Sequence, residues 1–462
     1  MQKQFANRTN RVQIPYYAHT KPSHQICAPQ NFFYLRRMQE DFLHYVWQHK
    51  KMSLISLKTT AQEPIILKTV GLPNVNSGPD FFNAQLSIGT QLWAGTVEIH
   101  VKSSDWYVHH HETDAAYDNV ILHVVWEHDM EIYRKDNTPI PTLELKNYVL
   151  PHTYKNYNTL LNQKQAWIPC ELTIKEVDGF TVNHWLERLY LERLEGKYQA
   201  IEMQLLDSKH NWEAVLFWQL AKNFGLKVNG EAFLSIAKST SFSIIRKSQH
   251  DALHLEALFF GQAGLLETEA QHPYITELKS AYEFLKNKFS LSNEGVLPVQ
   301  FFRLRPPNFP TLRLAQLASL YSRCSNLFSS TIEAQSLDQI YTIFEGATSK
   351  FWDTHYTFEK PSKSTPKKLT KAFINLLIIN TIVPIKFAYN KFNRHASQED
   401  VFEIMRTIPS EHNSIVDKFH SLYTFEKTAL DSQALIQLMQ MYCSKNKCLQ
   451  CAIGSALLNR NS

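Results

Sequence analysis

Glycine is scarce in this sequence, and several common signatures of enzymes and exported proteins are missing. Only 13 of the 462 residues are glycine, which favours helices over glycine-rich loops. No glycine-rich phosphate loop, Gly-x-Ser-x-Gly elbow or His-Glu-x-x-His motif occurs, so nucleotide hydrolysis, esterase and zincin chemistry lack motif support. The first 19 residues contain two arginines but no apolar core of a secretory signal.

A long apolar run is also absent. The most apolar stretch, residues 374–388, is shorter than the roughly 20 residues that a membrane span needs, and it contains Lys386 and two asparagines. We predict a core helix there, kinked or ended near Pro384. The expected protein is therefore cytoplasmic and makes no membrane contact. Its net charge of +5, with 20 histidines counted as neutral, permits nucleic-acid binding without requiring it.

The length and composition predict more than one globular domain. A chain of 462 residues exceeds one ordinary core, and 44% apolar with 20% charged residues is typical of a folded protein. We expect an α+β protein with four parts: an N-terminal arm (1–30), a mixed α/β domain (31–150), a linker (151–180) and an all-helical domain (181–462).

Apolar spacing gives the elements expected in the α/β domain. A helical period runs over 34–49, and strands are expected at 65–70, 82–88, 97–101, 119–126 and 143–145. Alternation would bury Phe82, Ala84, Leu86 and Ile88, and the run 119–126 reads as a strand buried on both faces. A short helix over 111–117 completes the order helix, three strands, short helix, strand.

Reactive side chains gather between residues 78 and 123. Asp80 heads one strand, while Glu98, His100 and Lys102 project from one face of the next. Asp80 and Glu98 would supply the hard oxygen ligands that magnesium or manganese prefers, and Glu40 would complete the metal shell. Either His100 or Lys102 could orient or deprotonate a water.

Two considerations weigh against this reading. A strand with glutamate, histidine and lysine on one face is usually a solvated surface. Regular pleating would also put Asp80 and Glu98 on opposite faces of the sheet, so a bulge or a strand break at Pro79 is needed to bring them together.

A second candidate site lies immediately downstream. His109, His111 and Asp114 are spaced for a metal face, with His123 inside the following strand, so a zinc hydrolase is an alternative. His123 on its own is more often a buried histidine satisfied by hydrogen bonds than a ligand.

Pro79-Asp80 and Glu98-Ile99-His100 resemble the motif of the PD-(D/E)XK nuclease superfamily, whose core runs helix, three strands, helix, strand. The resemblance implies a restriction-endonuclease-like domain and a metal-dependent phosphodiesterase acting on DNA or RNA. His100 stands where that family has lysine, and Lys102 lies two residues further along the same face of the strand. Which of the two activates the water is therefore left undecided. The alternative is a non-catalytic nucleic-acid-binding or scaffolding protein on a degenerate nuclease core.

From Glu40 onward the chain resembles a bacterial family, domain-of-unknown-function family 2851, which implies no activity. The matching stretches are Gly78-Pro79-Asp80-Phe81, the segment from Trp93 to Asp105-Trp106, His109-His110-His111, Asp114, Tyr117, Asn119-Val120-Ile121-Leu122-His123, the run Arg303 to Pro310 with Arg313, and the C-terminal cysteines.

Two further motifs lie in the helical region. Cys443, Cys448 and Cys451 offer three soft ligands for zinc or an iron–sulfur cluster, with Cys170 or Cys324 as the fourth, although free cysteines also pack well in a core. Arg303, Arg305 and Arg313 stand among rigid prolines, where they would contact nucleic-acid phosphates or form an interdomain junction.

Overall fold

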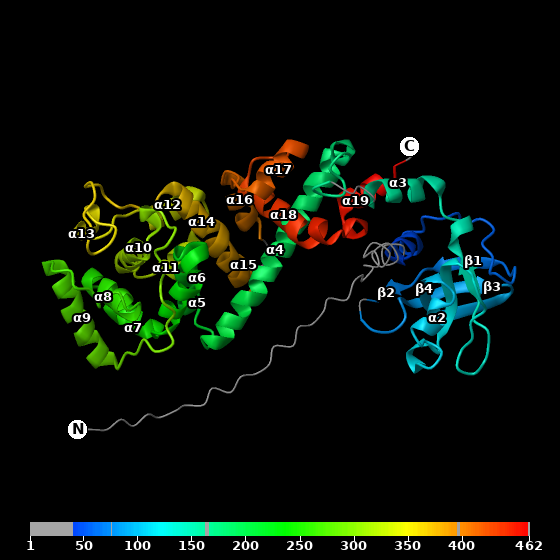
Figure 1. The fold of residues 1–462 in the computed structure, drawn as a ribbon, viewed down its shortest axis with the longest axis horizontal. Coiled ribbons are helices and arrows are strands. Elements are labelled where there is room, and N and C mark those ends of the chain that lie inside the picture. The colour runs from blue at the N-terminus through cyan, green and yellow to red at the C-terminus, as the bar shows by residue number, and fades with distance from the viewer. Residues whose placement is uncertain (1–39, 75, 162–165, 395–397, 461–462) are drawn as a thin grey trace, which may run out of the picture. The chain divides into compact units, whose positions relative to one another are not determined.

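The computed structural model describes residues 40–460 except 75, 162–165 and 395–397. It separates into two compact units, Met1–Tyr157 and Asn158–Ser462 (Figure 1). The first contains a mixed sheet and the second is helical, which confirms the α+β division expected from the sequence. The predicted arm, residues 1–30, lies outside the described residues.

The first unit is built on one curled six-stranded sheet. Its elements are a helix over 40–48, β1 (Ile65–Thr69), β2 (Leu72–Pro73), β3 (Phe81–Ile88), β4 (Gln91–Lys102), α2 (Asp105–Val108), η1 (Ala115–Tyr117), β5 (Val120–Glu127), β6 (Thr142–Glu144) and η2 (Leu145–Asn147). The strand order is β1-β3-β4-β5-β6, with β2 paired to β3. Strands β1, β3 and β4 run antiparallel, whereas β4, β5 and β6 run parallel.

The two central strands are buried on both faces. Residues 95–101 of β4 and 120–125 of β5 are all buried, as the near-continuous apolar run of β5 predicts. The chain passes from β4 to β5 through α2 and η1. The single helix expected over 111–117 is absent from this described segment, because the backbone of His110 is left-handed (φ 59°) and Asp114 caps η1 by accepting the amide of Ala116.

A bulge interrupts the pairing of β3 with β4. Phe81 pairs with Val97 and Ala84 pairs with Gly95, so three steps along β3 match two along β4. The extra residue falls within 82–83, where Asn83 adopts a left-handed backbone (φ 58°). A one-residue shift of register reverses the face on which every preceding side chain lies.

The bulge overturns the simple alternation expected for β3. Phe81 is buried at 2% exposure, whereas Phe82, which alternation placed inside, is 37% exposed. Gly71 accommodates the displaced backbone, since a Cβ at that position would meet Phe82 O at 2.5 Å. Because Phe81 lies opposite Val97, the preceding residue Asp80 comes to the same face as Glu98.

The second unit consists of packed helices. They are α3 (Pro151–Leu161, which begins in the first unit), η3 (Ile174–Glu176), α4 (Gly179–Asp207), α5 (Trp212–Phe224), α6 (Leu226–Lys238), α7 (Phe242–Ser248), α8 (Ala252–Gln262), α9 (Pro273–Phe289), η4 (Pro306–Asn308), α10 (Pro310–Arg323), α11 (Leu327–Glu333), α12 (Leu337–Phe344), α13 (Lys350–Asp353), α14 (Lys371–Leu377), η5 (Ile378–Ile382), α15 (Val383–Phe392), α16 (Glu399–Thr407), α17 (Ser414–Leu422), α18 (Ala429–Gln437), η6 (Leu438–Tyr442), η7 (Cys443–Lys445), η8 (Cys448–Gln450) and α19 (Ala452–Leu458). The long helix α4 packs against α15, α18 and α19. The predicted linker, 151–180, contains α3 and η3.

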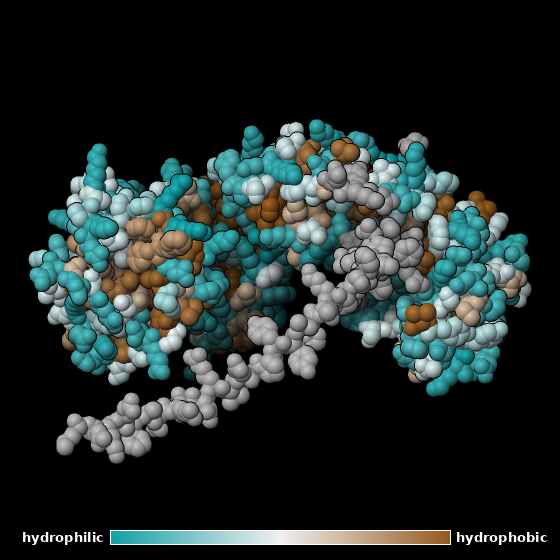
Figure 2. All heavy atoms as spheres, in the orientation of Figure 1, coloured by the Kyte–Doolittle hydropathy of each residue, from teal (hydrophilic) through white to brown (hydrophobic). Residues whose placement is uncertain are grey.

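The apolar stretch forms one continuous helix from Lys371 to Phe392. Its 22 residues are long and apolar enough to cross a membrane, but 72% of its most apolar window is buried inside the protein, as in the core helix of a helical domain. The helix continues through Pro384, although proline has no amide hydrogen to donate. The π-helical segment η5 lies immediately before this part of the helix. On the face seen in Figure 2, hydrophilic side chains cover most of the surface and hydrophobic ones form scattered patches.

The left-handed residue in the bulge gives a stability prediction. Asn83→Val should lower the free energy of unfolding of the protein by about 1–2 kcal/mol, because a β-branched residue is strained at positive φ. Asn83→Gly is the matched control and should leave stability near the wild-type value, since Asn83 is exposed and glycine adopts this conformation freely. Denaturant unfolding measures both, and equal effects of valine and glycine would contradict the strain argument.

Candidate functional site

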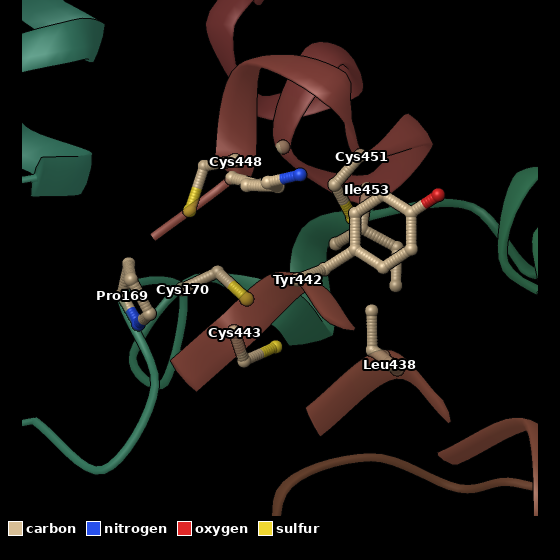
Figure 3. Close-up of a pocket in the computed structure, with 10 residues that line it drawn as sticks. Pro169, Cys170, Leu438, Tyr442, Cys443, Cys448, Cys451 and Ile453 are labelled. Atoms are coloured by element: carbon tan, nitrogen blue, oxygen red, sulfur yellow. The ribbon is translucent and has the colours of Figure 1, made fainter. Parts of the chain in front are cut away.

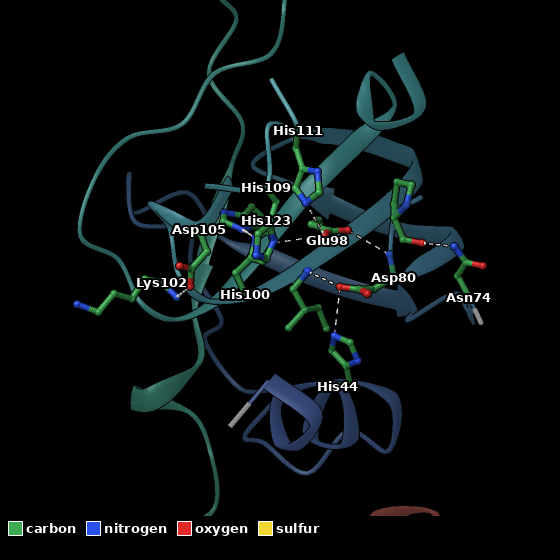
Figure 4. A network of polar contacts seen from close by, with 12 residues as sticks. His44, Asn74, Asp80, Glu98, His100, Lys102, Asp105, His109, His111 and His123 are labelled. Carbon is green, nitrogen blue, oxygen red and sulfur yellow. Dashed lines mark hydrogen bonds and ion pairs between the residues drawn. The ribbon is translucent and has the colours of Figure 1, made fainter. Parts of the chain in front are cut away.

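Two carboxylates are joined across β3 and β4 by reciprocal hydrogen bonds (Figure 4). The amide of Asp80 donates to Glu98 Oε2 at 3.1 Å, and the amide of Ile99 donates to Asp80 Oδ2 at 2.9 Å. His44 approaches the same Asp80 oxygen from the helix 40–48, with its Nε2 at 3.2 Å. The bulge therefore brings together the two carboxylates that regular pleating would separate.

Three histidines, here called the histidine set, adjoin Glu98. Its members are His100, His109 and His111, and one nitrogen from each lies within 4.8 Å of the others. The Nε2 atoms of His100 and His111 are 3.4 Å and 3.3 Å from Glu98 Oε1. His100 Nε2 is also 3.0 Å from His109 Nδ1. The two sites considered separately in the sequence are thus one continuous cluster.

His123 holds the buried end of this cluster in place. It lies beside Glu98 in the β4–β5 pairing and is fully buried, with its Nε2 2.8 Å from His100 Nδ1. This contact occupies Nδ1 of His100 and leaves Nε2 facing Glu98. A histidine that binds a metal through one nitrogen commonly has its other nitrogen fixed by a neighbour in this way.

The loop after α2 turns His109 and His111 to the same side. The left-handed backbone of His110 reverses the chain between them, and His110 itself is exposed. His111 stacks on Tyr117 with ring centroids 3.8 Å apart, and Trp106 packs edge-on against both rings. This aromatic packing fixes the ring plane of His111, so its Nε2 stays directed at Glu98.

Burial governs the ionisation of the cluster. It lowers the pKa of His100 well below its ordinary value, that of His111 to about 4 and that of His123 to about 3, and the neighbouring histidines lower each of them further. Burial, reinforced by Asp80, raises the pKa of the Glu98 carboxyl well above its usual range. His100, His111 and His123 are therefore neutral at pH 7, the form in which imidazole binds a metal.

Three separations in the cluster are close to those expected between the ligands of one metal ion. Zinc–nitrogen bonds of 2.0–2.1 Å in a tetrahedral site place the ligand atoms about 3.3 Å apart. The three contacts among Glu98 Oε1 and nitrogens of the histidine set span 3.0–3.4 Å. Glu98 and His100 are buried, His111 is half-buried and His109 is exposed, so the cluster opens to the surface at one end.

Not every predicted site residue joins this cluster. Lys102 points away, with its Nζ 4.0 Å from Glu127 Oε2 (Figure 4). Asp114 is occupied in capping η1. Glu40 lies near Asp80 on the helix 40–48: burial raises its pKa to about 7, His44 lowers it and Asp80 raises it further.

His44 was not anticipated from the sequence. It follows Glu40 by four residues on a helix, which puts both side chains on one face. That spacing was readable, but nothing in the local sequence connects the helix with Asp80.

The predicted arginine segment divides into exposed and buried members. Arg303 and Arg305 are exposed, whereas Arg313 is 7% exposed. Its Nη1 donates to Gln316 Oε1 at 2.8 Å and its Nη2 to Asn308 Oδ1 at 2.7 Å, while the guanidinium lies 3.5 Å from the centre of the Phe373 ring. Burial lowers its pKa to about 10. Arg313 is thus a packed structural residue, contrary to the phosphate contact expected of it.

The cysteine motif gains its fourth member from the far end of the helical unit. Cys170 lines one small cavity together with Cys443, Cys448 and Cys451 (Figure 3). Cys324, the other residue considered for this place, lies elsewhere and is 3.8 Å from Asn326 Oδ1 through its sulfur.

Comparison with known families assigns the chain to one of them. The model of the family described as protein of unknown function (DUF2851) matches residues 40–414, more than half of the chain. The chain belongs to this family. No curated protein and no solved structure matches it significantly. The matched region includes the whole histidine cluster and ends before Cys443.

The different surroundings of the arginines give opposite predictions for two variants. Arg313→Ala should lower stability by roughly 1–3 kcal/mol and lower the melting temperature, because it leaves the side-chain oxygens of buried Gln316 and half-buried Asn308 without this donor. Arg305→Ala is the matched control and should melt at the wild-type temperature. If the exposed arginine binds phosphate, its loss should also reduce the salt slope of nucleic-acid affinity by about one. An unchanged salt slope would remove Arg305 from the binding surface, and an unchanged melting temperature for Arg313→Ala would contradict its structural role.

Proposed function

We propose that this protein is a metal-dependent phosphodiesterase, a nuclease acting on DNA or RNA, whose metal is held by Glu98 and the histidine set. One observation carries the proposal: one nitrogen from each of three histidines lies within 4.8 Å of the others, and Glu98 Oε1 lies 3.4 Å and 3.3 Å from two of these histidines, His100 and His111. A divalent cation there would neutralise the charge that develops on a phosphate and activate a water as the nucleophile.

The donor atoms decide which cation to expect. Magnesium prefers carboxylate and water oxygens, whereas imidazole suits manganese poorly but zinc and related transition ions well. A set of three histidines and one carboxylate therefore favours a transition ion, zinc above manganese, over magnesium. Asp80 adjoins Glu98, and Glu40 lies near Asp80 and His44, so both offer further oxygens close to the set.

The residues around the metal position have separable roles. Hydrolysis requires a water oxygen to attack phosphorus, the P–O bond to the leaving group to break, and a proton to reach the departing oxygen. Asp80 is placed to accept the proton of the attacking water. His44 is placed to supply a positive charge: burial lowers its pKa, but its hydrogen bond to Asp80 and the charges of nearby carboxylates outweigh burial and raise the pKa overall.

The choice of phosphodiester as substrate rests on the arrangement of the unit. Its order of helix, antiparallel strands, short helix and parallel strand, with Asp80 and Glu98 on neighbouring strands, resembles the core of the PD-(D/E)XK nucleases. His100 occupies the place of that family's lysine and belongs here to the metal shell. Exposed Arg303 and Arg305 in the helical unit are the residues we assign to phosphate contact.

One observation favours a non-catalytic alternative. Glu98, His100 and His123 are buried and already hydrogen-bonded to one another or to the backbone, so they also stabilise the unit without a ligand. A nucleic-acid-binding or scaffolding protein could retain such a network after losing activity. Activity measurements on matched variants distinguish the two functions.

Metal-depleted protein should cleave single-stranded, double-stranded or branched DNA or RNA after zinc, manganese or magnesium is restored. His111→Ala and Glu98→Gln should each reduce this cleavage by at least about 100-fold, because each removes a metal ligand. His110→Ala is the matched control: this neighbouring histidine is exposed and outside the set, so its loss should leave cleavage unchanged.

Calorimetric titration of each metal into the same proteins separates binding from chemistry. Stoichiometric binding that is lost in His111→Ala but kept in His110→Ala supports the metal site. Metal binding without cleavage of any of these nucleic acids would contradict the nuclease proposal. It would favour the non-catalytic binding or scaffolding protein. Equal losses in both histidine variants would contradict the assignment of ligands.

A further inference from the structure

Four cysteines from the two ends of the helical unit line a single small cavity. Cys170 precedes η3, while Cys443, Cys448 and Cys451 belong to the successive 3₁₀ turns η7 and η8 and to the residue before α19. Figure 3 shows the four side chains around the cavity, which has a volume of about 10 Å³, enough for a single water-sized particle. The apolar residues Pro169, Leu438 and Ile453 close it.

Backbone donors lie around the sulfur of Cys451. The amides of Gly454 and Ile453, at the start of α19, interact with it. The indole of Trp185 adjoins this sulfur, and its Nε1 is buried without a hydrogen-bond partner among the described atoms. An ionised sulfur would give this buried donor a strong acceptor.

Close packing fixes the turns that carry Cys443 and Cys448. A Cβ on Gly454 would lie 2.1 Å from the carbonyl oxygen of Cys448, so only glycine allows α19 to begin against that turn. The left-handed backbone of Asn446 (φ 52°) separates the turn of Cys443 from that of Cys448. Three sulfurs that are near in sequence are thereby brought to one side of the chain, facing Cys170.

Four thiols are an unusual way to line an apolar cavity. Cys170, Cys448 and Cys451 are buried and Cys443 is half-buried. A cation bound among them would stabilise thiolates that otherwise repel one another.

We propose that Cys170, Cys443, Cys448 and Cys451 bind one zinc ion as four thiolates. The small cavity suits a single ion better than an iron–sulfur cluster. Among the described residues only the histidine set already has three ligand atoms within 4.8 Å, so the cysteine side chains turn inward to reach zinc–sulfur distances of about 2.3 Å. The ion would tie the start of the helical unit to its C-terminal turns, independently of the proposed nuclease site.

Cobalt substitution tests this site without interference from the histidine set. Cobalt bound by thiolates shows sulfur-to-metal charge-transfer absorption, which imidazole and carboxylate ligands cannot produce. Full-length protein loaded with one equivalent per site should show this absorption, and Cys448→Ser and Cys170→Ser should lose it. Cys324→Ser, which changes a cysteine outside the cavity, is the matched control and should keep it.

Measurements on the wild-type protein remain decisive if a cysteine variant does not fold. Protein purified without added metal should contain zinc that a mercurial reagent releases in proportion to the thiols it modifies. A chelator should lower the melting temperature, and added zinc should restore it. Freely reacting thiols at these four positions with no bound metal would overturn the site. Stoichiometric iron with acid-labile sulfide would overturn its assignment to a single zinc ion.

Discussion

The reciprocal hydrogen bonds between Asp80 and the segment Glu98–Ile99 are the constraint on which the rest of the site depends. Each partner uses one backbone amide and one carboxylate oxygen, so neither carboxylate can shift without breaking the pair. The pair exists only because the bulge at Asn83 adds one residue to β3. A regular β3 would direct Asp80 to the opposite face and leave Glu98 with the histidines alone.

This arrangement brings two carboxyl groups together. In the described part of the chain, every ion pair made by Asp80 or Glu98 is with a histidine: His44, His100 or His111. Burial lowers the pKa values of His100 and His111 and raises that of Glu98, so all three side chains are neutral near pH 7. His44, whose pKa is raised, is the ion-pair partner of Asp80. A metal ion bound by Glu98 and the histidines would therefore have to displace the proton of Glu98.

Sequence periodicity predicted the elements better than it predicted how they meet. Strong alternation and the apolar run of residues 119–126 located β3, β4 and β5, and the change in composition separated the sheet from the helices. Periodicity does not reveal a residue with a left-handed backbone. Alternation therefore predicted that Phe82 is buried, whereas Phe81 is the buried ring in the structure. The need for a bulge or for a strand break at Pro79 was nonetheless deducible, because two carboxylates of one site cannot lie on opposite faces. The bulge lies within residues 82–83.

Candidate site residues close in sequence were also easier to find than those that the fold brings in from afar. The spacing of His109 and His111, and that of Cys443, Cys448 and Cys451, is visible in the sequence. His44 and Cys170 reach their partners only through tertiary packing. Arg313 shows the opposite error: its proline-rich surroundings suggested exposure, but an amphipathic helix, α10, buries it against Phe373. Local spacing identifies the kind of side chain that could bind a ligand. It does not reveal which side of the helix or strand faces solvent.

The burial of the histidines explains how one cluster can be both rigid and accessible. His123 and His100 are 0% and 1% exposed and are locked together, so they fix the direction of the innermost nitrogen. His111 is held by its stack on Tyr117, and His109 completes the set at the surface. A site that binds a substrate needs both properties, because preorganised ligands avoid reorganisation during the reaction and an exposed edge admits the reacting group. His109 also partners the buried ring of His100 at 3.0 Å, so the residue at the edge continues the chain of histidine contacts that begins at His123.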